Sequence, residues 1–151
     1  MRKLVIALFA LAACRSSSAT SGGAGGRAPR PGADAPRAAV QTFLTAVKAQ
    51  DLQAMSNVWG SEKGPAREII DDRAELEKRE IVMQCYLNHD RYRILDDVAG
   101  QGQERVFRVE LTKGSLTRTT TFTTVRGPSD RWFVLTADLE PVKELCSRRQ
   151  G

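Results

Sequence analysis

The feature that most constrains the fold of this chain is a change of hydrophobic period near residue 90. Before this point, apolar residues recur every three or four positions, as on one face of an amphipathic helix. After it, they alternate with polar residues, as on half-buried strands. Helical and strand-forming segments are thus separated along the chain, which is typical of α+β domains. The chain length and the 41% hydrophobic content suffice for one such domain with its own core.

Three helices are expected in the first part of the domain. The first covers residues 36–50 and opens with a proline, which suits the first position of a helix. A second, short helix follows Asp51, whose carboxylate can cap its N-terminus, and ends at Gly60. Pro65 opens the third and longest helix, which should end near Asn88. Its expected buried stripe comprises Ile69, Ile70, Leu76, Ile81, Val82, Met83, Tyr86 and Leu87.

The second part of the domain predicts an antiparallel meander. Its strands are expected at residues 92–98, 105–112, 116–125 and 132–139, and the links between them are short and rich in turn-forming residues. In the last strand, one face is wholly apolar and should pack on the helices or line a pocket; it comprises Phe133, Leu135, Ala137 and Leu139. Residues 141–146 suit a short closing turn or helix.

The N-terminus has the features of a bacterial export signal. Arg2 and Lys3 precede an apolar run at residues 4–13. This run is too short to span a bilayer, which takes about 20 apolar residues. It closes with Leu-Ala-Ala-Cys, ending at Cys14, and this resembles the lipobox of bacterial lipoproteins. The resemblance implies cleavage before Cys14 and attachment of lipid to its sulfur. The alternative is an ordinary secretory peptide with Cys14 as a bystander.

The domain boundaries follow from composition. Residues 1–13 are expected to be the signal peptide, and residues 14–35 the lipidated cysteine with a flexible tether of Gly, Ser, Ala and Pro. The α+β domain should cover residues 36–147, and residues 148–151 should be a disordered C-terminus. Arg15 follows the cysteine where the lipoprotein family's inner-membrane retention signal has Asp, so the outer membrane, facing the periplasm, is favoured if the host has two membranes.

The order of elements resembles a known superfamily. Three helices precede a four-stranded meander, with Phe43-Leu44 in the first helix, an Asp51-Leu52 corner and Arg131-Trp132 at the start of the last strand. This is similar to the nuclear transport factor two-like superfamily, also called SnoaL-like or cystatin-like, which is common among bacterial lipoproteins. The resemblance implies helices packed in a strongly bent, cone-shaped antiparallel sheet around a pocket. Some members isomerise, cyclise or dehydrate small apolar substrates, and many only bind or assemble.

Few residues are candidates for chemistry. His89, the sole histidine, stands at a predicted helix end, and Asp138 stands near the end of the last strand on the face opposite the apolar one. Both are weak catalytic candidates, because a helix-end or strand-end role explains them better. One histidine and two remaining cysteines do not make a zinc site, so neither a metal nor a cofactor is expected. The larger aromatic residues are expected to form the core and the wall of a pocket: Trp59, Tyr86, Phe107, Phe122 and Trp132.

Cys85 and Cys146 are predicted to form a disulfide. Once Cys14 is lipidated they are the two cysteines left, an even number in an oxidising compartment. The fold can bring the closing segment beside the end of the long helix. The alternative is two buried free thiols.

Two functions of different classes follow from these observations. The first is an envelope lipoprotein, anchored in the membrane by its lipid, whose domain binds a small apolar ligand or a protein partner without catalysis. The second is a small-molecule isomerase or cyclase of the same fold. A homodimer or a partner on the sheet is also expected, because Trp132 and Val134 make the second face of the last strand apolar too. The net charge of +5 arises mostly in the N-terminal region, so nucleic-acid binding is not expected.

Overall fold

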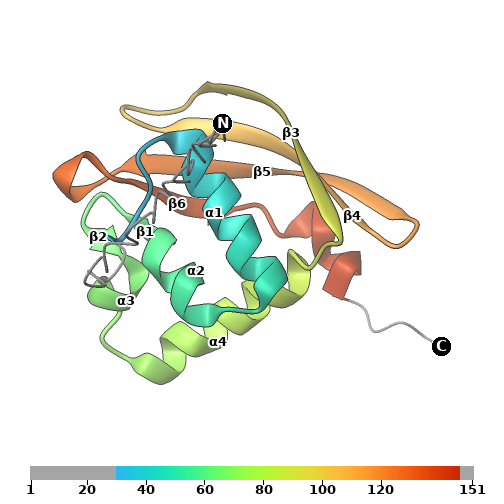
Figure 1. Cartoon of the computed structure of the whole chain (residues 1–151), viewed down its shortest axis with the longest axis horizontal. Coiled ribbons are helices and arrows are strands. Elements are labelled where there is room, and N and C mark those ends of the chain that lie inside the picture. Colours follow the sequence, from blue (N-terminus) through green and yellow to red (C-terminus); the bar gives the residue numbers. More distant parts are fainter. Residues whose placement is uncertain (1–29, 147–151) are drawn as a thin grey trace, which may run out of the picture.

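The computed structural model describes residues 30–146 of the chain. Helices lie on one side of a four-stranded sheet (Figure 1). The helices are α1 (Pro36–Ala49), α2 (Leu52–Val58), α3 (Ala66–Ile69) and α4 (Arg73–Tyr86). The sheet contains β3 (Arg91–Ala99), β4 (Arg105–Lys113), β5 (Leu116–Arg126) and β6 (Trp132–Ala137). A short hairpin of β1 (Gly60–Ser61) and β2 (Gly64–Pro65) joins α2 to α3, and the 3-10 turns η1 (Pro128–Asp130) and η2 (Glu140–Cys146) flank β6.

The predicted signal peptide, Cys14, most of the tether and residues 148–151 lie outside the described residues. The predictions made for them stay predictions. Within residues 30–146, no helix is both long and apolar enough to cross a membrane.

The predicted α+β class, with several helices and a four-stranded antiparallel sheet, is confirmed. The strand order β3-β4-β5-β6 follows the sequence, as expected for a meander with short links. The first two helices also begin where the sequence predicts. Pro36 is the first residue of α1, and the carboxylate of Asp51 accepts a hydrogen bond of 2.9 Å from the backbone N–H of Ala54 at the start of α2.

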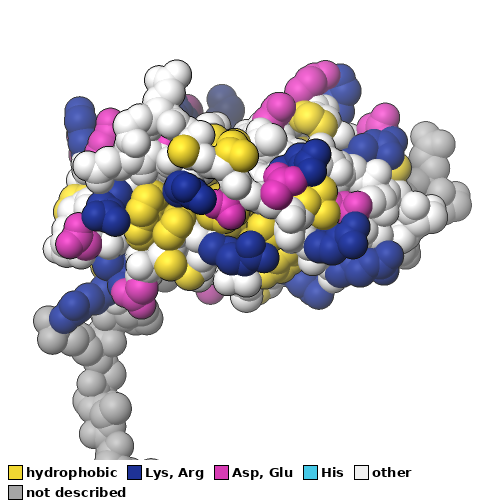
Figure 2. Space-filling view, turned by 90° about the horizontal axis from the view of Figure 1, so that it is seen from above, with side chains coloured by type: hydrophobic (Ala, Val, Ile, Leu, Met, Phe, Trp, Pro, Cys, Tyr) yellow, Lys and Arg dark blue, Asp and Glu magenta, His cyan; other side chains and the backbone are white. Residues whose placement is uncertain are grey.

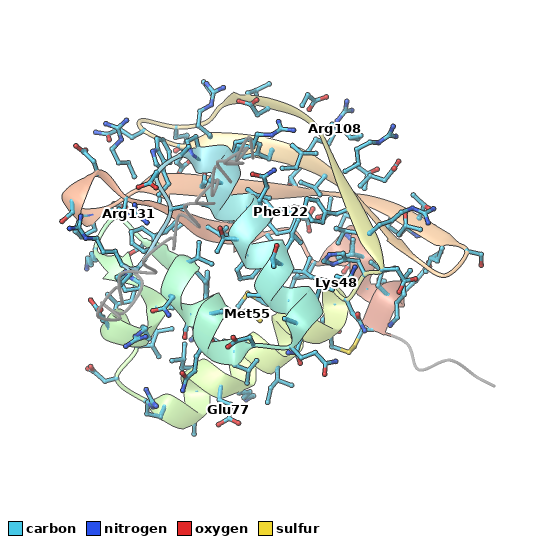
Figure 3. The ribbon with its side chains drawn as sticks, in the orientation of Figure 1. Lys48, Met55, Glu77, Arg108, Phe122 and Arg131 are labelled. Atoms are coloured by element: carbon cyan, nitrogen blue, oxygen red, sulfur yellow. A yellow bond between two sulfur atoms is a disulfide. The ribbon has the colours of Figure 1, made fainter. Side chains whose placement is uncertain are left out.

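The interior of the sheet is filled by side chains of this chain. Phe43 of α1 meets Phe122 of β5 edge to face, with ring centroids 6.2 Å apart. Phe107 of β4 and Met55 of α2 are fully buried in the same cluster. In Figure 3, Phe122 lies where β5 meets α1, and Met55 lies among the helices. The resemblance implies a pocket between the sheet and the helices, but around Phe43, Phe107 and Phe122 this space is filled by the hydrophobic core.

The predicted helix from residue 65 to residue 88 is wrong in one respect, since the chain forms two helices there. The break falls at residues 70–72, where Asp72 starts α4 by accepting hydrogen bonds from the backbone N–H groups of Ala74 and Glu75, at 2.9 and 3.2 Å. An aspartate inside a charged run is a weak signal next to a continuous helical pattern. The role of Asp72 as an N-cap is therefore clear from the structure and not from the sequence.

The expected stripe on this helix is also partly wrong. Ile69, Ile81 and Val82 are 40%, 49% and 41% exposed, whereas Leu76 and Glu80 are buried. The side of α4 that faces inward carries Leu76, Glu80, Met83 and Leu87, at the spacing of one helix face. Apolar periodicity does not count a glutamate as a buried residue, so it places the stripe on Ile81 and Val82 instead.

The orientation of the last strand differs from the expectation. The register shifts opposite Thr123/Thr124, so Trp132 and Val134 face the core together with Ala137, while Phe133 faces the other way. Phe133 is nevertheless buried, because Gly32 and Gly127 lie against its ring; an added Cβ would come within 2.9 Å of it at Gly32 and 2.7 Å at Gly127. A bulge inverts the alternation on which the prediction depends.

The domain begins before the predicted boundary at residue 36. Ala33 pairs with Trp132 through two backbone hydrogen bonds, of 2.9 and 2.8 Å, and so covers part of the edge of β6. The guanidinium of Arg131 donates to the carbonyl oxygens of Pro31 and Gly32, at 3.1 and 2.6 Å, and forms an ion pair with Asp34. The last residues of the predicted tether are thus part of the fold. Composition alone cannot show this, because their partners lie about a hundred positions later in the sequence.

The cysteines predicted to pair are bonded in the structure. Cys85 near the end of α4 and Cys146 at the end of η2 form a disulfide. Figure 1 shows η2 beside the C-terminal end of α4. The bond fixes this end of α4 to the closing segment.

Candidate functional site

An apolar groove lies between α4 and β6 and has a volume of about 310 Å³. Its walls are formed by six apolar side chains, and its rim by charged and polar ones. The apolar residues are Trp59, Val82, Met83, Leu135, Ala137 and Leu139. The rim residues are Glu75, Lys78, Arg79 and Thr136. An apolar hollow with a few polar groups at its edge is the usual form of a small-molecule site.

Trp59 is held rigidly at one end of this groove. Its backbone N–H donates to the carbonyl of Met55 at 2.8 Å, and its carbonyl accepts from the N–H of Ala66 at 2.7 Å. A parallel bridge joins it to Val134 of β6. The indole therefore stands at the junction of α2, β1 and β6. It is half-buried, so part of the ring faces the groove.

The α4 wall combines apolar side chains with a charged rim. Val82 is 41% exposed although it lines the groove with Met83. On the rim, the guanidinium of Arg79 pairs with the carboxylate of Glu75 at 2.7 Å. Lys78 forms no ion pair with another described residue. The groove thus offers an apolar floor and one uncompensated positive charge at its edge.

His89 lies in the core rather than in this groove. Its side chain is 3% exposed, its Nδ1 lies 2.8 Å from the carbonyl oxygen of Leu87, and its ring meets Tyr92 edge to face. Burial lowers the pKa of His89, so the neutral imidazole is favoured, with Nδ1–H donating to Leu87. These contacts hold the link between α4 and β3 in place.

Asp138 is exposed and terminates β6. Its carboxylate accepts a hydrogen bond of 3.1 Å from the backbone N–H of Glu140, at the start of η2. Its backbone carbonyl accepts from the hydroxyl of Thr120. These contacts are those of a strand-end cap.

The aromatic residues named in the sequence analysis differ in burial and in location. Phe107 and Phe122 are core, and Trp132 is 9% exposed with the guanidinium of Arg126 5.2 Å from its ring. Tyr86 is half-buried at the end of α4. Trp59 lines the groove. Of the groove residues, the sequence predicts Val82 and Met83 in the buried stripe of the long helix, and Leu135, Ala137 and Leu139 on the strand face that packs on the helices or lines a pocket. Lys78 and Arg79 belong to a charged run, which is typical of a solvated helix face.

The other surface considered from the sequence is the sheet. On β3, Leu95 and Val98 are 36% and 60% exposed. Neighbouring charges are paired, Arg93 with Glu110 at 3.2 Å and Arg108 with Asp96. Seen from above (Figure 2), apolar patches are interrupted by Lys, Arg, Asp and Glu side chains. The described part of the chain also contains no cluster of three His, Cys, Asp or Glu residues that could hold a metal ion.

No protein-family model matches the chain, and no curated protein matches it. Among solved structures, the chain is similar to an NTF-2-like protein of unknown function from Shewanella oneidensis MR-1. The two share 16% sequence identity with a TM-score of 0.41, over 67% of this chain and 92% of that chain.

Proposed function

We propose that this chain is a lipid-anchored protein of the bacterial cell envelope whose domain, of the nuclear transport factor two-like type, binds a small apolar ligand in the groove between α4 and β6. Arg2, Lys3, the apolar run at residues 4–13 and Cys14 support the anchor. In a host with two membranes, the position of Arg15 favours the outer membrane, with the domain in the periplasm. Binding without chemical conversion is the proposed activity.

The observation that carries the proposal is the apolar groove itself. The interior of the sheet is occupied by Phe43, Phe107 and Phe122, so a ligand has no room at this level. The groove, by contrast, exposes part of Trp59 and Val82 to an open hollow of about 310 Å³. This volume is at the lower end of the range for ligand pockets, roughly 300–1,000 Å³, which favours a small ligand.

The charge at the rim refines the ligand class. Because Arg79 is already paired with Glu75, Lys78 is the rim cation with no ion-pair partner among the described residues. A carboxylate on the ligand can pair with its ammonium group while an apolar body lies on Trp59 and Met83. We therefore propose a small apolar molecule that carries one acidic group.

The alternative function, a small-molecule isomerase or cyclase, requires an acid or base that touches the ligand. The groove offers Glu75, Lys78 and Arg79, two of which neutralise each other at the rim. His89 is in the core and Asp138 caps a turn. The geometry therefore favours binding.

The test uses methionine methyl groups as reporters. Met83 lines the groove, whereas Met55 is fully buried in the core. The full chain, labelled with ¹³C in the methionine methyl groups and reconstituted in nanodiscs, is titrated with 4-methylbenzoate, a water-soluble apolar acid. The Met83 signal should shift and saturate, while the Met55 signal stays nearly constant.

A matched pair of variants locates the binding. Val82→Glu places a carboxylate in the groove and should weaken binding by about tenfold or more. Val98→Glu makes the same change at an exposed valine on β3 and should leave binding unchanged. The proposal is wrong if Met83 does not respond, or if both variants weaken binding equally.

A further inference from the structure

A second cleft lies between α2 and α4, and the groove described above does not include it. It has a volume of about 230 Å³. Its residues come from two helices: Leu52, Gln53 and Ser56 from α2, and Arg73, Leu76, Glu77 and Glu80 from α4. Two leucines give it an apolar side, and three charged residues of α4 face the same space.

Glu80 is the unusual residue of this cleft. It is 4% exposed, and its Oε1 atom has no hydrogen-bond partner among the described residues. Ser56 of α2 hydrogen-bonds the carboxyl group, but not at Oε1, and its hydroxyl also lies 3.1 Å from the carbonyl oxygens of Leu52 and Gln53. A buried carboxyl oxygen without a donor is unfavourable, and folded proteins avoid it unless a further group satisfies it. The described residues of the cleft therefore leave Oε1 without a hydrogen-bond donor.

Two opposite charges stand at the mouth. Arg73 and Glu77 are one turn apart on the exposed face of α4, a spacing that permits an ion pair. Glu75 and Arg79, with the same spacing on the next face, do pair, at 2.7 Å. Neither Arg73 nor Glu77 forms an ion pair with another described residue. Figure 3 shows Glu77 projecting from α4 on the side away from the sheet.

We propose that this cleft binds a small zwitterion of the amino-acid class. Its ammonium group donates to the carboxylates of Glu80 and Glu77, and its carboxylate pairs with the guanidinium of Arg73. An aliphatic side chain lies on Leu52 and Leu76. The ligand thus supplies the donor that Glu80 lacks and compensates both charges at the mouth. The volume admits one such molecule and not a longer peptide.

The proposal has a pH dependence of defined sign. Burial raises the pKa of Glu80 to about 7, with a smaller contribution from Glu77 in the same direction, while hydrogen bonding by Ser56 and the charge of Arg73 oppose the rise. α2 faces the carboxyl group with Ser56 and Gln53, which do not titrate. An ammonium ion is best bound by the ionised carboxylate, so binding displaces a proton. Affinity should therefore increase between about pH 6 and about pH 8.

Isothermal titration calorimetry of the full chain in nanodiscs tests this inference with three probes of similar size. Norvaline has both charges, butylammonium lacks the carboxylate, and valerate lacks the ammonium group. Norvaline should bind, butylammonium should bind about tenfold more weakly, and valerate should give no measurable heat. Proton release, measured in buffers of different ionisation enthalpy, should accompany norvaline binding near pH 7.

Variants separate this site from the groove. Glu80→Gln should weaken norvaline binding by about tenfold or more and abolish the proton release, and Arg73→Gln should reduce norvaline to the affinity of butylammonium. Arg73 and Glu75 lie at the surface, so substituting them leaves the core unchanged. The control Glu75→Gln should bind norvaline as tightly as the wild type does. Val82→Glu should not alter norvaline binding, so failure of the groove proposal would leave this one intact. Binding of valerate as tight as that of norvaline, equal losses in Glu75→Gln and Glu80→Gln, or no norvaline binding would each overturn the inference.

Discussion

Ionisation of Glu80 should make the domain less stable as the pH rises. Its carboxyl group has an ordinary pKa of 4.5 in the unfolded chain and of about 7 in the folded one. Between these values the folded state keeps a proton that the unfolded state has released, so the free energy of unfolding falls with increasing pH. The stabilisation is fully present below about pH 4.5 and is lost as the pH passes through 7. The difference of the two pKa values corresponds to about 3 kcal/mol, and access of water at the mouth of the cleft lowers this to about 2 to 3 kcal/mol.

Urea denaturation at a series of pH values between about 5 and about 8 measures this effect in the wild-type chain, in Glu80→Gln and in the control Glu75→Gln. His89 contributes with the opposite sign, because burial lowers its pKa and its stabilisation grows as the pH rises through 6.5. That contribution is common to all three proteins, so the difference between wild type and Glu80→Gln isolates Glu80. The difference should change by about 2 to 3 kcal/mol across the series, and Glu75→Gln, which does not contribute to the pKa of Glu80, should keep the pH dependence of the wild type. A Glu80→Gln variant with the pH dependence of the wild type would refute the reasoning.

Three further predictions concern the anchor and the fold. Mass spectrometry of the mature N-terminus should find diacylglycerol on Cys14, and an unmodified N-terminus downstream of it would contradict the lipoprotein assignment. Replacing Cys85 and Cys146, which are 61 positions apart, by alanine should lower the free energy of unfolding by about 4 kcal/mol through the loop entropy of the unfolded chain; two titratable thiols in the denatured, non-reduced protein would argue against the bond. Arg131→Ala should cost about 2 kcal/mol, because it removes charged hydrogen bonds to the N-terminal segment, and should accelerate hydrogen exchange at the amide of Ala33; unchanged exchange there would count against the clamp.

The elements that the sequence predicts well are those specified by local signals. Pro36 is the first residue of α1 and Asp51 is the N-cap of α2, so each helix start is marked by a residue at the start itself. The strands likewise follow from alternation and from short turn-rich links, and their sequential pairing needs no distant information. The disulfide can be predicted for a different reason, since the two cysteines left after Cys14 can form one intramolecular pair.

The features that the sequence does not predict depend on distant contacts. The face that Phe133 occupies cannot be read from the alternation of the whole strand, because the register of β6 shifts between Val134 and Thr136, and Phe133 is covered by a glycine from the N-terminal segment about a hundred positions earlier. The same segment lay in the predicted tether, because its Gly and Pro content resembles a linker. The groove between α4 and β6 also depends on distant contacts, since its lining residues come from Trp59, α4 and β6, which are far apart in the sequence.

Glu80 connects the fold of α4 with the two sites proposed on its flanks. The helix rests on the domain through one narrow stripe that includes this glutamate, and Leu at the same position would bury more apolar surface without an unpaired oxygen. With its other end fixed to η2 by the disulfide, α4 tolerates this cost and presents Val82 to one hollow and Glu77 to the other. Violations of local rules in natural domains concentrate at functional sites. A buried, unsatisfied carboxyl group in a core position is such a violation, and it directs the search for a ligand to the α2–α4 cleft.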